Sequence, residues 1–265
     1  MKVAVLLSGG VDSSVALNLL LRQGYSDITA YYLKIWLEDE MSYMGSCPWE
    51  EDLQYAEAVC AQAGVPLRVV PLQQAYYDRV VEYVVQELKA GRTPSPDIFC
   101  NQRVKFGAFW EYLAEAAGGA DVVATGHYAR IDRLAGDSAL AGAGGSAESG
   151  GLALLRRAPD PVKDQSYFLS HLSQDQLSRI EFPLGGFFKS QVRDLANEFE
   201  LPNRDRPDSQ GICFLGKIRY ADFVGYYLGE RDGAIVERES GRELGRHRGY
   251  WYHTIGQRQG LGLGN

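Results

Sequence analysis

The segment Ser8–Ser14 combines residue types that bind phosphate. It reads Ser-Gly-Gly-Val-Asp-Ser-Ser and joins an apolar run, Val3–Leu7, to an amphipathic stretch, Ser13–Gln23. Two glycines let the backbone approach a phosphate closely, and amide groups, hydroxyls and the positive end of the following helix favour an anion. Asp12 would by itself repel phosphate, so we expect it to help hold a Mg²⁺ that bridges the phosphates. The alternative is an ordinary strand–helix turn, where Gly, Ser and Asp are also common.

Cysteines form the second group of reactive residues. A helix predicted from about residue 102 places Cys100 at its N-terminus, where the helix dipole lowers the pKa of a thiol, and Asp97 precedes it by three residues. Cys213 lies far away in sequence, within Gly-Ile-Cys-Phe. For any single cysteine the alternative is a small buried hydrophobe, which we favour for Cys60, while Cys47 stays open. The four cysteines have no zinc-finger spacing.

The elements that must position these residues alternate between strands and helices. Such alternation predicts an α/β fold: an open, mostly parallel sheet with helices on both faces. Ligands of such folds bind at the carboxyl ends of strands near a switch point, which makes Thr125-Gly126-His127 a second candidate nucleotide contact. A single histidine such as His127 is more often structural. The strands are predicted at 3–7, 28–36, 67–71 and 121–125, and the helices at 13–23, 50–63, 76–89 and 102–117.

The second half of the chain is less regular. A β-hairpin is predicted from arms 129–133 and 152–156, joined by a flexible, low-complexity insertion at 135–151. Two further helices are predicted at 173–180 and 189–199. From about residue 205 the sequence becomes Gly-punctuated and rich in Tyr and Arg. We therefore expect a catalytic domain over 1–204 and a small, incomplete β-rich domain over 205–265.

Composition excludes several classes of protein. The 265 residues are 45% hydrophobic and 23% charged, as in globular proteins, and no apolar run approaches the roughly 20 residues that cross a bilayer. No signal peptide is recognisable, so we expect a soluble intracellular protein with no membrane partner. The net charge of −7 argues against a uniformly basic nucleic-acid-binding surface. The residues from Gly186 onward are nearly neutral, so a polynucleotide substrate stays open.

Several motifs together resemble one known family. The loop Ser8–Ser14 resembles that of the N-type ATP pyrophosphatases, which cleave ATP between the α and β phosphates. With the further motifs in this order, the chain resembles the tRNA-specific 2-thiouridylase family over nearly its whole length. It departs from the family pattern at Ser95, where Asn is common, and we expect the family's C-terminal β-barrel to be missing from it. The further motifs are Asp97-x-x-Cys100-Asn101, Thr125–Ala129, Lys163–Leu169, Gly211–Phe214 and His253–Arg258.

The resemblance implies a fold like the adenine nucleotide α-hydrolases and a complete reaction. ATP would adenylate the C2 oxygen of the wobble uridine (position 34) of tRNA, and sulfur would replace that oxygen. Cys213 would carry the sulfur as a persulfide, Cys100 would resolve it through a transient disulfide between the two, and Asp97 would act as general acid/base. The implied ATP contacts are Leu7, Ser8, Gly9, Gly10, Val11, Asp12, Ser13, Ser14, Leu33 and Gly126. The implied tRNA contacts are Ser95, Pro96, Asp97, Lys163, Asp164, Gln165 and Arg258.

The implied cofactors are ATP and Mg²⁺, with no tightly bound cofactor. The implied partners are tRNA and a persulfide donor, either a cysteine desulfurase or a sulfur relay protein. The expected compartment is the cytoplasm, with the plastid or mitochondrial matrix as alternatives. Two other functions compete: an amide-forming synthetase, which leaves the two spaced cysteines without a role, and a sulfur carrier or thiol redox partner, which does not need an intact Ser8–Ser14.

Overall fold

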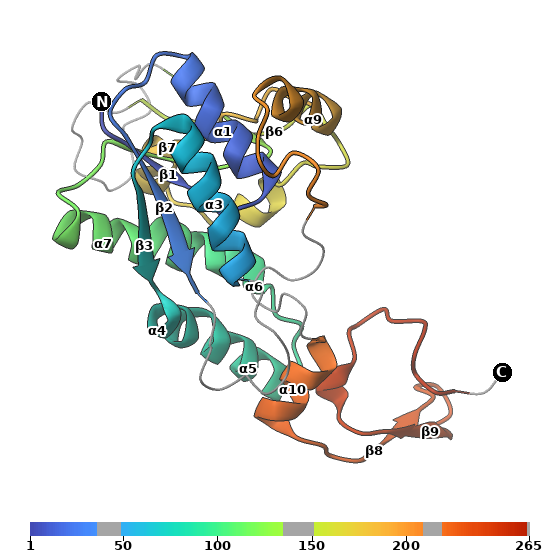
Figure 1. Ribbon diagram of the computed structural model, residues 1–265. Coiled ribbons are helices and arrows are strands. Elements are labelled where there is room, and N and C mark those ends of the chain that lie inside the picture. The colour runs from blue at the N-terminus through green and yellow to red at the C-terminus, as the bar shows by residue number, and fades with distance from the viewer. Residues whose placement is uncertain (36–48, 135–150, 209–218, 264–265) are drawn as a thin grey trace.

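A parallel sheet is the centre of the molecule (Figure 1). The computed structural model describes residues 1–35, 49–134, 151–208 and 219–263. Within them, five parallel strands follow the spatial order β3-β2-β1-β4-β7. Cys47, Cys213 and nearly all of the predicted insertion lie outside the described residues. The strands are β1 (Val3–Leu6), β2 (Ile28–Lys34), β3 (Leu67–Pro71), β4 (Val122–Ala124) and β7 (Ile180–Glu181).

Helices cover both faces of this sheet, because alternate residues of a strand point to opposite faces. Val3, Val5 and Leu7 of the β1 segment join a buried cluster with helices α1 (Val11–Arg22) and α3 (Trp49–Ala63). Ala4 and Leu6 join a larger cluster on the other face, with two long helical stretches. One stretch comprises α4 (Gln73–Tyr76), the π-helical η2 (Tyr77–Val81) and α5 (Glu82–Lys89). The other comprises α6 (Pro96–Phe99), the π-helical η3 (Cys100–Ala108) and α7 (Phe109–Ala116). The predicted fold class is confirmed.

The switch point of the sheet lies between β1 and β4. The two strands pair in parallel, with Val3 beside Val122 and Val5 beside Ala124. The chain continues from β1 through α1 to β2 on one side, whereas β4 and β7 lie on the other. The segments after β1 and β4 therefore emerge side by side, which is where an open α/β sheet binds its ligand.

Two predicted helix boundaries were wrong. The stretch that carries Cys100 begins at Pro96, because proline suits the first turn of a helix. Cys100 thus lies in the second turn and not at the helix N-terminus, where the dipole effect is strongest. The helix predicted to reach Ile180 is α8 (Gln174–Ser178), and Ile180 pairs with Val123 as the edge strand β7.

The remaining elements of the first 208 residues match the predictions closely. Strands β5 (Ala129–Arg133) and β6 (Ala153–Arg157) form the expected antiparallel hairpin. A 3₁₀ turn, η4 (Ser166–Leu169), and helix α9 (Lys189–Glu198) follow. None of the helices in the described ranges is both long and apolar enough to cross a membrane.

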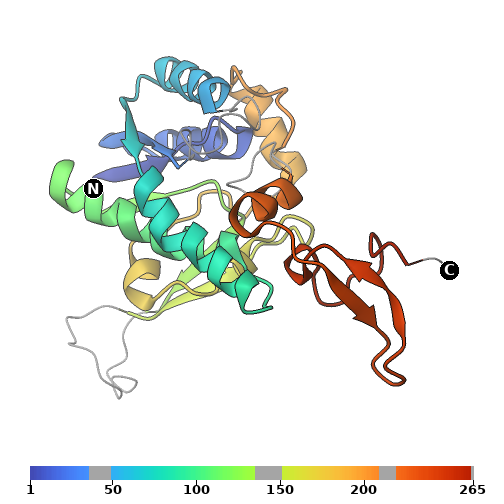
Figure 2. The ribbon, with the colours of Figure 1, turned by 90° about the horizontal axis from the view of Figure 1, so that it is seen from below.

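The C-terminal part is β-rich as expected and contains a small antiparallel sheet, formed by β8 (Gly233–Val236) and β9 (Glu243–His247) (Figure 2). It also contains helix α10 (Tyr220–Leu228), which the sequence did not predict, and the 3₁₀ turn η5 (Tyr250–Tyr252). Phe223 and Val224 of α10 and Trp251 of η5 join the large buried cluster beside the sheet. The C-terminal part is therefore fastened to the rest of the molecule by apolar packing at α10 and η5.

Two adjacent glycines test how closely the chain after β7 packs against β5. A Cβ at Gly185 would lie 2.0 Å from the carbonyl oxygen of Ala129, whereas a Cβ at Gly186 would meet nothing within 4 Å. We expect Gly185→Ala to lower the free energy of unfolding by about 1–3 kcal/mol, because backbone must move. Gly186→Ala should change it by less than about 0.5 kcal/mol. Urea denaturation of both variants measures the difference, and equal stabilities would contradict the close approach.

Candidate active site

The loop between β1 and α1 is packed so tightly that glycine is required in it. Gly9 has φ +74°, and a Cβ there would lie 2.1 Å from the backbone oxygen of Asp52 in α3. Gly126, after β4, approaches the same loop: a Cβ there would lie 2.7 Å from the amide nitrogen of Ser13. The loop is thus held between α3 and the end of β4 by contacts between backbones.

The loop amides are available to a ligand, and its carbonyl groups are not. Within the described part of the chain, none of the amide groups from Gly9 to Ser13 donates a hydrogen bond. The hydroxyls of Ser13 and Ser14 both donate to the carbonyl oxygen of Gly10, at 3.0 Å each. Consecutive unpaired amides at the start of a helix of this length form an anion site.

Asp12 connects the loop to a cluster of charged residues. Its Oδ1 accepts hydrogen bonds from the hydroxyl of Tyr128 at 2.9 Å and from Nζ of Lys189 at 2.6 Å. Nζ of Lys189 also lies 2.8 Å from Asp208. Lys163 and Arg193 contact Asp208 as well, at 2.6 Å and 2.5 Å. Three cations therefore surround one carboxylate next to the phosphate-binding amides.

Burial and charge set the protonation of this cluster. Burial alone would raise the pKa of Asp208, but hydrogen bonds from Lys163 and Lys189 hold it well below its usual range. Burial, together with the charge and hydrogen bond of Asp12, raises the pKa of Tyr128. At neutral pH Asp208 is therefore charged and Tyr128 keeps its proton.

The residues around Asp12 can hold Mg²⁺ only if a nucleotide supplies some of the ligands of the ion. Among the described residues no group of three or more His, Cys, Asp or Glu side chains is arranged to hold a metal. Mg²⁺ in nucleotide sites is commonly held by one or two carboxylates, with waters and phosphate oxygens as the other ligands. Asp12, whose Oδ2 accepts no hydrogen bond from a described residue, can supply such a carboxylate.

His127 is a neutral, structural side chain. Its Nδ1 lies 2.7 Å from the hydroxyl of Thr125, and its ring lies near the rings of Phe106 and Phe182. Burial, helped by the charge of Lys105, lowers the pKa of His127 to about 3. The imidazole is therefore neutral near pH 7, with a proton on one ring nitrogen only.

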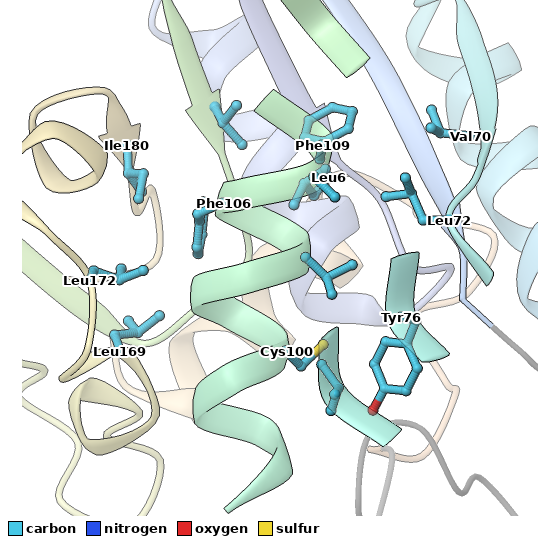
Figure 3. Close-up of a cluster of buried hydrophobic side chains, with 14 of the residues drawn as sticks. Leu6, Val70, Leu72, Tyr76, Cys100, Phe106, Phe109, Leu169, Leu172 and Ile180 are labelled. Carbon is cyan, nitrogen blue, oxygen red and sulfur yellow. The ribbon is translucent and has the colours of Figure 1, made fainter. Parts of the chain in front are cut away.

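Cys100 and Asp97 lie on one helical stretch, one turn apart. Cys100 is 1% exposed and belongs to the same buried cluster as Leu6, at the end of β1, as Figure 3 shows. Asp97, in the first turn of α6, is half-buried. The thiol thus lies in the protein interior, while the carboxyl stays partly accessible.

The helical stretch is widened just after Cys100, and one glutamine stabilises the widened turn. Nε2 of Gln176 donates to the carbonyl oxygens of Gln102 and Phe106, at 2.8 Å and 2.7 Å. Nδ2 of Asn101 donates to the carbonyl oxygen of Phe168 at 3.0 Å. π-Helical turns occur frequently at functional sites, and this one fixes the face on which Cys100 is presented.

The segment 163–165, which was expected to contact tRNA, forms hydrogen bonds and an ion pair with other parts of the protein. Lys163 pairs with Asp208, and Asp164 accepts hydrogen bonds from the Ala158 amide at 2.9 Å and the Ser166 hydroxyl at 2.9 Å. Oε1 of Gln165 accepts from the Tyr128 amide at 3.0 Å. Asp164 and Gln165 thus order the turn that carries Lys163 toward the phosphate loop.

The other predicted residues are placed separately. Ser95 and Pro96 begin the helix of Asp97, Leu33 is half-buried near the end of β2, and Leu7 is buried after β1. Arg258 lies on the exposed C-terminal segment. The structure brings the loop, Gly126 and Lys163 together.

Sequence reasoning missed several residues of the site, among them Lys189, Asn203 and Arg206. One signal was available for Lys189. A lysine at the first position of a helix is unfavourable for the helix dipole, so an acidic partner or an anionic ligand was to be expected there. Asn203 and Arg206 lie in an irregular segment where no periodicity could single them out.

Comparison with known proteins identifies the class and then the family. Residues 1–217 match the model of the tRNA methyl transferase HUP domain, and residues 221–265 match that of the tRNA methyl transferase PRC-barrel domain. The parallel sheet with its phosphate loop thus belongs to a HUP domain, and the segment that follows it matches a second domain model.

Relatives define the family more closely. The chain is 46% identical over 264 residues to tRNA-specific 2-thiouridylase MnmA 2 of Bacteroides fragilis, covering 100% of this chain and 69% of that protein. It is also 46% identical over 266 residues to tRNA-specific 2-thiouridylase MnmA of Porphyromonas gingivalis, covering 99% and 67%. The chain belongs to the tRNA-specific 2-thiouridylase family. Among solved structures, U34-tRNA thiolase NcsA of Methanococcus maripaludis aligns with a TM-score of 0.46 and 17% identity over 86% of this chain and 70% of that one, a likeness too distant to inform function.

The first prediction for this site concerns Asp12. We expect Asp12→Ala to reduce ATP cleavage by at least about a hundredfold, because the loop loses its carboxylate and Lys189 loses a partner. The free energy of unfolding should change by less than about 2 kcal/mol, since Asp12 is not a core residue. Pyrophosphate release measures the activity. Asp194→Ala, an exposed change on α9, is the control, and a wild-type rate for Asp12→Ala would refute the role.

The second prediction concerns pH. The pKa of His127 is lowered in the folded protein, so protons bind the unfolded state preferentially and stability falls as pH drops below about 6.5. Between pH 7 and pH 5, His127 should account for about 2 kcal/mol of lost stability. Denaturation at both pH values should show a correspondingly smaller loss for His127→Gln. The exposed His171→Gln variant should behave like wild type, and an undiminished loss in His127→Gln would contradict the assignment.

Proposed function

We propose that this protein is an ATP-dependent tRNA-uridine 2-sulfurtransferase that converts the wobble uridine of tRNA to 2-thiouridine. The observation that carries the proposal is the presence of a phosphate loop and a buried thiol in the same domain. The unpaired amides of the phosphate loop follow β1, and the thiol of Cys100 lies in the large buried cluster that covers one face of the sheet. The relatives named 2-thiouridylases support the same activity.

The first half-reaction activates the uridine. C2 of uridine is a poor electrophile, so its oxygen attacks the α-phosphorus of ATP, pyrophosphate leaves, and the oxygen becomes part of an AMP leaving group. The loop amides and Lys189 offset the negative charge that develops on the departing pyrophosphate. Mg²⁺ held by Asp12 would supply further positive charge to the phosphates.

The second half-reaction transfers sulfur. The terminal sulfur of a persulfide on Cys213 attacks C2, and AMP departs with the former uridine oxygen. The thiolate of Cys100 then attacks Sγ of Cys213, the sulfur–sulfur bond breaks, and its electron pair stays on the new 2-thio group. A disulfide between Cys100 and Cys213 remains, which an external thiol must reduce. Asp97, partly accessible and one turn before Cys100, serves as general acid/base.

The substrate must expose its base to reach this site. A base in a tRNA loop has to be unstacked and turned outward before its C2 can meet the α-phosphate of ATP. Ser95, Pro96 and Asp97, at the start of the Cys100 helix, contact the flipped nucleotide in this proposal, and Arg258 contacts backbone phosphate. A persulfide donor loads Cys213 before each turnover.

Cysteine substitutions test the function. We expect Cys100→Ser and Cys213→Ser to keep tRNA-dependent release of pyrophosphate and to lower thiouridine formation by at least about a hundredfold, since serine can neither carry nor resolve a persulfide. Nucleoside mass spectrometry of the tRNA measures the product.

Cys60 provides the matched control. It is buried in α3, and burial raises the pKa of its thiol to about 11. Cys60→Ala should therefore leave both half-reactions unchanged. Normal thiouridine formation by Cys213→Ser would move the persulfide role to another cysteine, with Cys47 the next to test. ATP cleavage stimulated by glutamine or a small acid instead of tRNA would favour a synthetase.

A further inference from the structure

Asn203 is a buried polar residue whose amide contacts the phosphate loop directly. The residue is 1% exposed and lies in the irregular segment that follows α9. Its Nδ2 donates to the carbonyl oxygen of Gly9 at 2.8 Å and to Oγ of Ser14 at 2.9 Å. Burying a polar amide lowers the stability of the folded protein unless hydrogen bonds offset the loss of water, and these two bonds supply that compensation for Nδ2.

The two hydrogen bonds of Asn203 fix two successive peptide planes. In a trans peptide, the carbonyl oxygen and the following amide hydrogen point in opposite directions. Because the Gly9 oxygen is held toward Asn203, the amide of Gly10 points away from it. Ser14 accepts from Asn203 and in turn donates to the carbonyl oxygen of Gly10, which orients the amide of Val11 in the same way.

Arg206 reinforces the first of these planes. Its guanidinium donates to the same Gly9 oxygen at 3.2 Å and pairs with Asp52 of α3, whose backbone already touches Gly9. Further along the same segment, Asp208 binds Lys189, which in turn holds Asp12. The segment from Asn203 to Asp208 therefore holds the loop at both of its ends.

We propose that Asn203, assisted by Arg206, is the positioning residue of the phosphate loop: it turns the Gly10 and Val11 amides toward the phosphates of ATP. The inference rests on the proposed use of ATP. Asn203 does not touch the nucleotide itself. It acts through Gly9 and Ser14, and its effect is confined to the part of ATP that the loop amides bind.

The test compares two ligands that differ in their phosphates. We expect Asn203→Ala to weaken the binding of α,β-methylene-ATP, a non-cleavable ATP analogue, by about tenfold, because the amides are no longer pre-oriented. The affinity for AMP, which lacks the β and γ phosphates, should stay within about twofold. Isothermal titration calorimetry with the full chain measures both, and thermal melting reports whether the variant is folded.

Asn18→Ala is the matched control. Nδ2 of Asn18 also donates to a backbone oxygen, that of Ser14 at 2.9 Å, but this carbonyl lies within α1, and Asn18 contacts neither the Gly9 nor the Gly10 carbonyl. Its affinity for α,β-methylene-ATP should match wild type within about twofold. Arg206→Met, which removes the second donor to Gly9, should weaken the affinity for the analogue by about threefold. This variant provides the test if Asn203→Ala does not fold.

The outcomes separate this inference from the proposed function. A folded Asn203→Ala that binds the analogue like wild type would overturn the positioning role and leave ATP use intact. Equal losses for AMP and the analogue would also overturn it, since they indicate general damage. If Asn203→Ala does not fold, unchanged binding by Arg206→Met overturns the inference. Failure of the wild-type protein to bind the analogue would overturn both.

Discussion

The close approach of three backbone segments around the start of α1 is the constraint on which the rest of the site depends. Gly9 lies against the backbone of Asp52, and Gly126 lies against that of Ser13, at separations that leave no room for a side chain. The parallel pairing of β1 with β4 brings these segments together at the switch point of the sheet. Because these contacts fix its position, the loop keeps its consecutive amides exposed to a ligand.

Electrostatic interactions hold the side chains around the loop in place. Asp208 gathers Lys163, Lys189 and Arg193, and Lys189 extends the cluster to Asp12. Each charge is partly buried and paired, which reduces the cost of removing it from water. A polyanionic ligand would find cations already assembled beside the amides that bind phosphate, so little reorganisation is needed when it arrives.

The helical stretch of Cys100 holds a reactive thiol in the protein interior. Its π-helical turns change the face that the residues before and after them present. Gln176 of α8 donates hydrogen bonds to these turns, and Asn101 within them donates to the carbonyl oxygen of Phe168 in η4. The same apolar cluster contains residues of α10 and η5, so the C-terminal part and the Cys100 helix share one core. The thiol is consequently part of a rigid scaffold and not of a surface loop.

The sequence by itself determined the strand–helix alternation, the phosphate loop, the hairpin and the family, because these depend on local periodicity and on contiguous motifs. It misplaced the start of the Cys100 helix and missed β7 and α10, whose conformations depend on partners elsewhere in the chain: Ile180 forms a strand because Val123 lies beside it. It also could not show that Asn203, Arg206 and Lys189 complete the loop, since residues nearly two hundred positions apart meet only after the sheet has formed. Local interactions decided which elements form, and tertiary packing decided which side chains reach the site.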